Sequence, residues 1–313
     1  MAKKRKVKKG RVFILAMISF LFIFTLLLAF KKIYSLIDNK NTVSLSSLDV
    51  NNIDFSEMQE LNIDLYSKSY LLVRLNDFKA LYGKNVDEKF YPASLAKIVT
   101  LDTVVKNVNN LNDVSYISDA DYESLIEANA SLAYLTTNYE YTIDDLLYAL
   151  VLPSGGDGAL ALENYFSSQG ENLVSLMNEN VKNLNLNNSN FTNTTGLHND
   201  NLYTTLSDYA SIVVDCLNYD ESKNVLTSFS HTLSDGLTVR STLSSLNKSF
   251  DDAVVYGGKT GFTGQAGENI MVLFSCKNRS YMLILTGADG NPYVDGENYH
   301  LIDANSVIKY LSD

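Results

Sequence analysis

Strand-like segments occur near both ends of this chain, and helix-like segments fill the region between them. The runs that read as strands are 66–75, 79–83, 254–262, 267–276 and 280–287. Very short connections join the runs within each group, which implies antiparallel neighbours. We therefore expect an α/β fold of the α+β kind. It would have one antiparallel five-stranded sheet from both chain ends, flanked by helices, with an inserted helical subdomain.

The segments between the strand groups carry helix signals. Apolar residues recur at helical spacing over 94–105. Thr142 and Asp145 form a capping box before a second apolar run, and Thr205 and Asp208 begin another helix. These signals place helices throughout the middle of the chain, and a further helix is expected near its end.

The first 32 residues differ from the rest of the chain in charge. Nine of the 25 lysines and arginines lie there, and no acidic residue precedes Asp38. The remainder carries 16 basic against 36 acidic residues, a net charge of about −20, although the whole chain has −11. A surface this acidic is not expected to bind nucleic acid or anionic lipid.

Residues 12–30 form a 19-residue run without charge, which is long enough for a helix that crosses a bilayer. Seven cations precede it and two follow it, so the N-terminus is expected in the cytoplasm. A cleaved signal peptide is the alternative, but the run is long and lacks a clear cleavage site. We expect a single-pass membrane protein with a cytoplasmic basic tail (1–11), a transmembrane signal anchor (12–30), a stalk (31–60) and an extracytoplasmic domain (61–313).

Two cysteines and three histidines leave little material for a metal site. Cys216 and Cys276 lie in apolar runs, so two buried free thiols are the simpler interpretation, although an extracytoplasmic protein can also pair them. No histidine lies close to a cysteine in the sequence, which argues against zinc. We expect no metal and no other cofactor.

Ser94 and Lys97 form a Ser-x-x-Lys motif just after Pro92. Residues three apart share one face of a helix, so the Lys97 amine can reach the Ser94 hydroxyl. A lysine takes a proton from serine only when its amine is neutral, which requires burial or nearby cations. The alternative is a helix-start serine beside a solvated lysine. The same spacing recurs at Ser245–Lys248 and Ser306–Lys309, so the motif alone does not decide.

A second motif, Ser154-Gly155-Gly156, follows a predicted helix. Glycine permits a sharp turn and close approach of a substrate. A hydroxyl held in such a turn can pass a proton to a leaving amine. The alternative is an ordinary turn between two helices.

A third motif, Lys259-Thr260-Gly261, lies within a predicted strand and follows two glycines. Glycine in a strand often marks close approach of a ligand, and a lysine with a hydroxyl can bind a carboxylate. The N–H of Phe262, together with that of Ser94, can stabilise an oxyanion. The alternative is an edge strand with a protective lysine.

In this order the three motifs resemble the signature of penicillin-binding proteins and class A β-lactamases. The flanking residues narrow the resemblance to the serine D-alanyl-D-alanine carboxypeptidases. The similar blocks are Tyr91–Thr100, Asp145–Gly155, Phe191–Leu197, Tyr203–Asp208 and Gly258–Gly267. The resemblance covers about residues 60–290 and implies a β-lactamase/transpeptidase-like fold for the extracytoplasmic domain.

The resemblance also implies an activity. The enzyme would remove the terminal D-alanine from peptidoglycan stem peptides ending in D-Ala-D-Ala, and β-lactam antibiotics would bind it. Ser94 would form the acyl-enzyme, Lys97 would act as general base and Ser154 would relay the proton.

Substrate binding would fall to the third motif. Lys259 and Thr260 would hold the terminal carboxylate, and Gly261 and Phe262 would also contact the substrate. One residue departs from the family pattern, because Gly156 stands where Asn is usual. This glycine removes a side-chain amide that would contact Lys97 and the substrate, so either the backbone or a water replaces it or turnover is slow.

Two other functions are compatible with these motifs. A class A-like β-lactamase would need a glutamate on the loop before the third motif, and none lies between Glu179 and Glu221. The other is a catalytically weak sensor that binds peptidoglycan or β-lactams, and the glycine at position 156 gives this alternative some support. The intact pair of Ser94 and Lys97 argues against the sensor, because a pure binder has no need of a nucleophile and its base.

Overall fold

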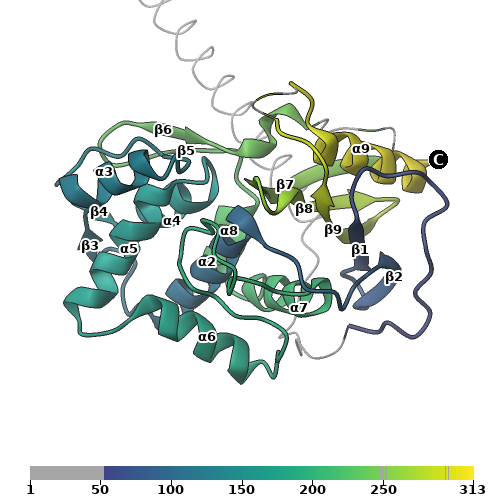
Figure 1. Cartoon of the computed structure of the whole chain (residues 1–313), viewed down its shortest axis with the longest axis horizontal. Helices are drawn as coiled ribbons and strands as arrows, with labels where there is room; N and C mark the ends of the chain where they lie inside the picture. Colours follow the sequence, from purple (N-terminus) through teal and green to yellow (C-terminus); the bar gives the residue numbers. More distant parts are fainter. Residues whose placement is uncertain (1–52, 247–249, 251, 293, 295) are drawn as a thin grey trace, which may run out of the picture. The chain divides into compact units, whose positions relative to one another are not determined.

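The sheet expected from both chain ends is present, with strand order β2-β1-β9-β8-β7 (Figure 1). The computed structural model describes residues 53–246, 250, 252–292, 294 and 296–313. Every neighbouring pair in this sheet is antiparallel. The strands are β1 (Ser69–Arg74), β2 (Lys79–Lys84), β7 (Ala253–Thr263), β8 (Gly267–Cys276) and β9 (Arg279–Ala288).

Successive side chains along each strand point to opposite faces of the sheet, and both faces are apolar. Leu72 pairs with Leu283, which pairs in turn with Val272, and this row faces the helix α9 (Tyr299–Ser312). The adjacent row of Val73, Met282 and Leu273 belongs to the other core, which contains the remaining helices. Because both faces are covered, the central strands are almost continuously apolar in sequence.

The helical part lies to one side of the sheet in Figure 1. Its helices are α2 (Ala96–Asn107), α3 (Asp119–Glu127), α4 (Ile143–Val151), α5 (Gly156–Ser168), α6 (Leu173–Asn183), α7 (Leu206–Cys216) and α8 (Asp220–Leu226). Two short antiparallel strand pairs accompany them: β3 (Val114–Ser115) with β4 (Tyr141–Thr142), and β5 (Ser230–Thr232) with β6 (Thr238–Arg240). The 3-10 turns η1 (Ala93–Leu95) and η2 (Thr242–Ser245) both contact β7, the edge strand nearest the helices.

The predicted helix starts are confirmed at the level of individual hydrogen bonds. The Thr142 hydroxyl accepts from the N–H of Asp145 at 3.1 Å, and the Thr205 hydroxyl accepts from that of Asp208 at 3.2 Å. Cys216 and Cys276 are both buried and unpaired, as the simpler interpretation predicts.

The N-terminal predictions meet the structure only in part. The segment predicted to cross the membrane, the predicted cytoplasmic tail and most of the predicted stalk lie outside the described residues. Residues 53–60, which the sequence assigns to the stalk, run beside β2, where Asp54 and Gln59 form bridges to Lys79 and Tyr82. The folded part therefore reaches back at least to Asp54. Among the helices of the described residues, none has the length and apolar character needed to cross a membrane.

Candidate active site

Ser94 lies in η1, immediately before α2, and its backbone is fixed from two sides. Ala93 has a positive φ of 49°, and Gly196 packs against it so closely that a Cβ there would lie 2.0 Å from the Ala93 oxygen. On the other side, a Cβ on Gly261 of β7 would lie 3.0 Å from the Ser94 nitrogen. Only glycine permits these approaches, and together they hold the serine in place.

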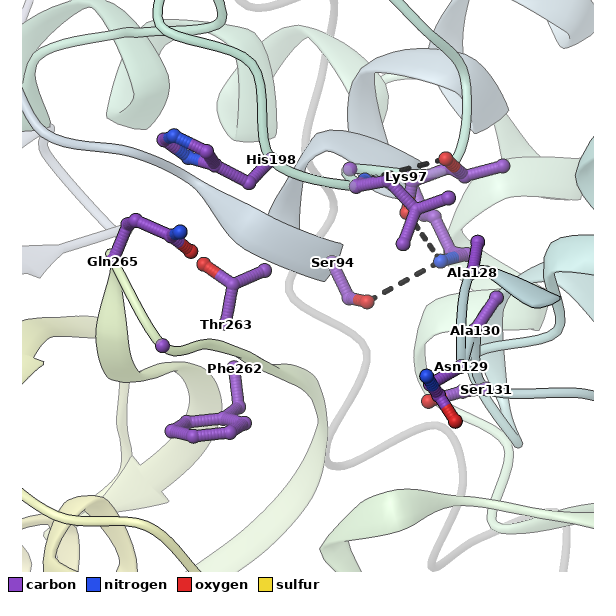
Figure 2. A pocket seen from close by; sticks show the side chains of 14 residues that line it. Ser94, Lys97, Ala128, Asn129, Ala130, Ser131, His198, Phe262, Thr263 and Gln265 are labelled. Carbon is purple, nitrogen blue, oxygen red and sulfur yellow. Dashed lines mark hydrogen bonds between the residues drawn. The ribbon is translucent and has the colours of Figure 1, made fainter. Parts of the chain in front are cut away.

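Lys97 is the immediate partner of Ser94. Its side chain is directed at the serine (Figure 2), with Nζ 3.2 Å from Ser94 Oγ, and it also donates to the Thr195 carbonyl. Lys97 is only 2% exposed. Burial lowers the pKa of its amine from 10.5 to about 7, and the charge of Asp157 opposes the fall. A substantial fraction of Lys97 is therefore neutral near pH 7, as a general base for serine requires.

Ser154 sits in a strained turn, with a positive φ of 65°, and is 4% exposed. Among the described residues its hydroxyl has no hydrogen-bond partner, and it lines a cavity that Ser94 also lines. Such strain tends to persist where function needs the conformation. The hydroxyl is thus available to a group bound beside Ser94.

Gly156 is the first residue of α5, and its N–H donates to the Ser131 carbonyl at 2.7 Å. A Cβ at this position would lie 3.0 Å from Cδ2 of Leu125 and 3.3 Å from that carbonyl. The loop 128–131 therefore packs against the space that a side chain at Gly156 would enter. A side chain at this position would therefore crowd its neighbours, which must shift to admit it.

Lys259 lies in β7 and is completely buried. Its Nζ donates to the carbonyl of Thr260 at 2.7 Å. Burial, and secondarily the charge of Lys97, lowers the pKa of its amine well below the usual value. Complete burial excludes the alternative of a protective lysine on an exposed edge. The Thr260 hydroxyl donates to that of Thr242 in η2 at 2.8 Å.

Two cavities meet at Ser94. The larger, of about 620 Å³, is shown in Figure 2 and is bounded by the loops 128–131, 195–198 and 262–265. The smaller, of about 250 Å³, is lined by Ser154 and Thr260, among others. Ser94 and Phe262 line both cavities, so an extended ligand can pass the serine with one end in each.

The structure brings most of the predicted site residues together. Those lining at least one of the two cavities are Ser94, Lys97, Ser154, Thr260, Gly261 and Phe262. Lys259 is completely buried and lines neither of the two cavities. Of the two other Ser-x-x-Lys pairs, Ser306 and Lys309 are exposed on α9, whereas Ser245 lines the smaller cavity.

Several residues that line the two cavities lie outside the predicted site, among them two histidines and Thr242. His198 lines the larger cavity and lies edge-on to Tyr91. Thr242 and His300 line the smaller one. No local pattern marks any of them, because each reaches the site through the packing of distant elements. The described residues contain no group of three or more His, Cys, Asp or Glu side chains placed to hold a metal ion.

The sequence matches a known protein family over most of its length. Residues 55–290 match the family described as D-alanyl-D-alanine carboxypeptidase. The chain belongs to this family. It is 29% identical over 205 residues to the D-alanyl-D-alanine carboxypeptidase DacF of Bacillus subtilis, covering 64% of this chain and 52% of the relative. It is 26% identical over 232 residues to the D-alanyl-D-alanine carboxypeptidase DacA of Haemophilus influenzae, covering 69% of this chain and 56% of the relative.

The fold of this family member is also similar to a solved structure. The Streptomyces K15 DD-transpeptidase superposes with a TM-score of 0.69 at 23% identity, covering 80% of this chain and 98% of that one. At this identity the similarity establishes the fold alone. The chain spans about half the length of the curated relatives it matches.

Proposed function

We propose that this chain is a serine D,D-peptidase that removes the terminal D-alanine from peptidoglycan stem peptides through an acyl-enzyme. The observation that carries the proposal is the buried Lys97 amine, 3.2 Å from Ser94 Oγ, whose pKa falls to about 7. A serine with a neutral amine at this distance has both parts of an activated nucleophile. Membership of the D-alanyl-D-alanine carboxypeptidase family supports the choice of substrate.

The reaction follows from the positions of the two cavities. The larger cavity takes the stem peptide and the smaller takes the terminal D-alanine, so the bond between the last two residues lies at Ser94. Lys97 accepts the serine proton as Oγ attacks the carbonyl carbon. The backbone N–H groups of Ser94 and Phe262 stabilise the oxyanion.

Release of D-alanine requires a proton on its nitrogen. The Ser154 hydroxyl, which is buried and lines the smaller cavity, passes that proton from Lys97 to the leaving amine. Water then attacks the ester at Ser94, and the same lysine takes its proton. As the ester bond breaks, Lys97 returns this proton to Ser94 Oγ, so the shortened peptide leaves and the free enzyme is restored.

The test uses the full-length chain in detergent with labelled penicillin and with a pentapeptide ending in D-Ala-D-Ala. We expect a label on Ser94 and release of free D-alanine, both lost in Ser94→Ala. Ser306→Ala is the matched control, because Ser306 has the same spacing to a lysine but is exposed on α9.

Three outcomes would contradict the proposal. Absence of label on Ser94 removes the acyl-enzyme. Label without release of D-alanine indicates a sensor of β-lactams. Rapid turnover of penicillin without action on the peptide indicates a β-lactamase.

We also propose that residues 12–30 anchor the chain in the membrane with residues 61–313 outside the cytoplasm. The uncharged 19-residue run and the seven preceding cations support this topology. The stem peptide as substrate supports it as well, because a peptidoglycan hydrolase must act outside the membrane. Digestion of intact protoplasts with external protease should remove the catalytic domain, and protection of that domain would contradict the topology.

A further inference from the structure

The smaller cavity beside Ser94 contains one ionisable side chain among the described residues that line it. Its other polar side chains are hydroxyls, apart from Asn298, and the ionisable one is His300. His300 is the second residue of α9 and is 5% exposed. A carboxylate bound in this cavity would therefore meet several neutral donors and a single group able to carry positive charge.

Glu268 holds the His300 ring in position. This glutamate comes from β8 and is completely buried. Its Oε2 contacts Nδ1 of His300 and also accepts from the His300 backbone N–H at 3.1 Å. Two links to one oxygen fix both the backbone and the ring. Because Nδ1 is committed to Glu268, Nε2 is the ring atom left to bond a ligand.

Lys259 is poorly placed to neutralise a ligand carboxylate. It is completely buried, its Nζ donates to the Thr260 carbonyl, and it does not line the cavity. Its lowered pKa further reduces the charge it carries. The ionisable group that lies in the cavity itself is His300.

The charges around His300 make its protonation depend on the ligand. Burial lowers the pKa of its imidazole, while Glu268 of β8 and Asp303 of α9 oppose the fall. A ligand carboxylate on the open side of the ring adds another anion. The N-terminus of α9 adds partial positive charge at the same place, which favours the bound carboxylate and by itself opposes protonation of the ring. A protonated imidazole between two carboxylates is then the favourable arrangement.

We propose that His300, oriented by Glu268, binds the terminal carboxylate of the substrate and makes recognition of that carboxylate dependent on proton uptake. This inference rests on the proposed D,D-peptidase function and names a specificity-determining residue for it. His300 is protonated when the carboxylate arrives and returns its proton to solvent when D-alanine leaves. A substrate whose terminal carboxylate is replaced by a neutral carboxamide does not favour protonation of His300, so its binding should not depend on proton uptake.

The test compares two peptides that differ only in this group. Acylation of Ser94 is measured for a pentapeptide ending in D-Ala-D-Ala and for the same peptide with a C-terminal carboxamide, from pH 5.5 to 8.5. Both reactions use Lys97, so its titration cancels in the ratio of the two rate constants. We expect a preference for the carboxylate of about tenfold or more at low pH, because a charge-assisted hydrogen bond is lost as His300 deprotonates.

Variants of the pair provide independent readouts. His300→Gln should show a small ratio that does not change with pH. Glu268→Gln should move the midpoint of the ratio to lower pH, since the glutamate charge favours the protonated ring. His231→Gln is the matched control, because that ring stacks on Tyr148, outside both cavities, and the ratio should stay as in the unchanged protein.

The ratio of the two acylation rate constants in the unchanged protein tests the role of His300 even if the variants fail to fold. A ratio that is flat across the pH range overturns the role of His300, while penicillin label on Ser94 would still support the proposed function. If neither peptide acylates the protein, calorimetry with Ser94→Ala in buffers of different ionisation enthalpy gives the answer. Proton uptake with the carboxylate peptide alone supports His300, and binding without it overturns the inference.

Discussion

Replacing Lys97 with methionine is expected to abolish acylation and, at the same time, to stabilise the folded domain. Lys97 is 2% exposed, and its pKa falls from 10.5 to about 7 on burial. Between these two pH values the unfolded chain holds a proton at this site that the folded chain lacks. Stability therefore rises with pH across that window and is lost as pH falls toward 7.

The size of the effect follows from the two pKa values. The fall from 10.5 to about 7 corresponds to a cost of roughly 5 kcal/mol at pH 7. Methionine has a similar length and avoids this cost. It also loses the bond to the Thr195 carbonyl, which costs about 1–3 kcal/mol if that group stays unpaired. The net expectation at pH 7 is a gain of about 2–4 kcal/mol in unfolding free energy.

Urea denaturation of Lys97→Met and of the unchanged protein at pH 6, 7, 8 and 9.5 measures this difference. The gain should be largest at pH 6–7 and should shrink as pH approaches 10.5. Lys309→Met is the control, because Lys309 is exposed on α9 and its replacement should change stability by less than about 0.5 kcal/mol. A Lys97→Met protein that is less stable at pH 7, or whose gain does not depend on pH, would refute a neutral buried amine.

Three further substitutions test the surroundings of the site. Asp157→Asn should move the acidic limb of the acylation profile to lower pH, because the charge opposing the fall in the Lys97 pKa is removed; an unchanged limb would count against that charge. Gly156→Asn should lower stability by about 1–3 kcal/mol by crowding Leu125, without faster release of D-alanine; faster release would show that the missing amide limits turnover. Gly196→Ala should lose at least about 3 kcal/mol in unfolding free energy, because its Cβ meets the Ala93 oxygen at 2.0 Å. Gly170→Ala shares the positive φ but meets no atom within 4 Å, so it should lose only about 1–2 kcal/mol, and equal losses would contradict the tight packing beside Ser94.

The elements that could be predicted from the sequence are those with local signals. The five strands are largely apolar runs in the sequence, and short turns join β1 to β2 and β7 through β8 to β9. The Thr142 and Thr205 caps lie three residues from the N–H groups they accept from. The short strand pairs β3–β4 and β5–β6 escape prediction because strands of two or three residues owe their pairing to tertiary packing.

In the site, too, contacts between residues close in sequence could be predicted, whereas contacts that depend on tertiary packing could not. Ser94 and Lys97 are neighbours in one helical turn, so their spacing predicts their contact. The burial of Lys259 is not predictable from its strand, because η1 and η2 cover the edge of β7. His300 follows Ser94 by 206 residues, and only the packing of α9 against β8 brings its ring to the same cavity.

In the proposed mechanism a neutral Lys97 amine makes Ser94 a nucleophile, so the most direct test is the titration of that amine. The full-length chain carrying lysine labelled with carbon-13 at Cε can be followed by NMR, and the Lys97 signal is the one absent from Lys97→Met. We predict a midpoint near pH 7. A midpoint near the ordinary lysine value of 10.5 would contradict general-base catalysis by this residue.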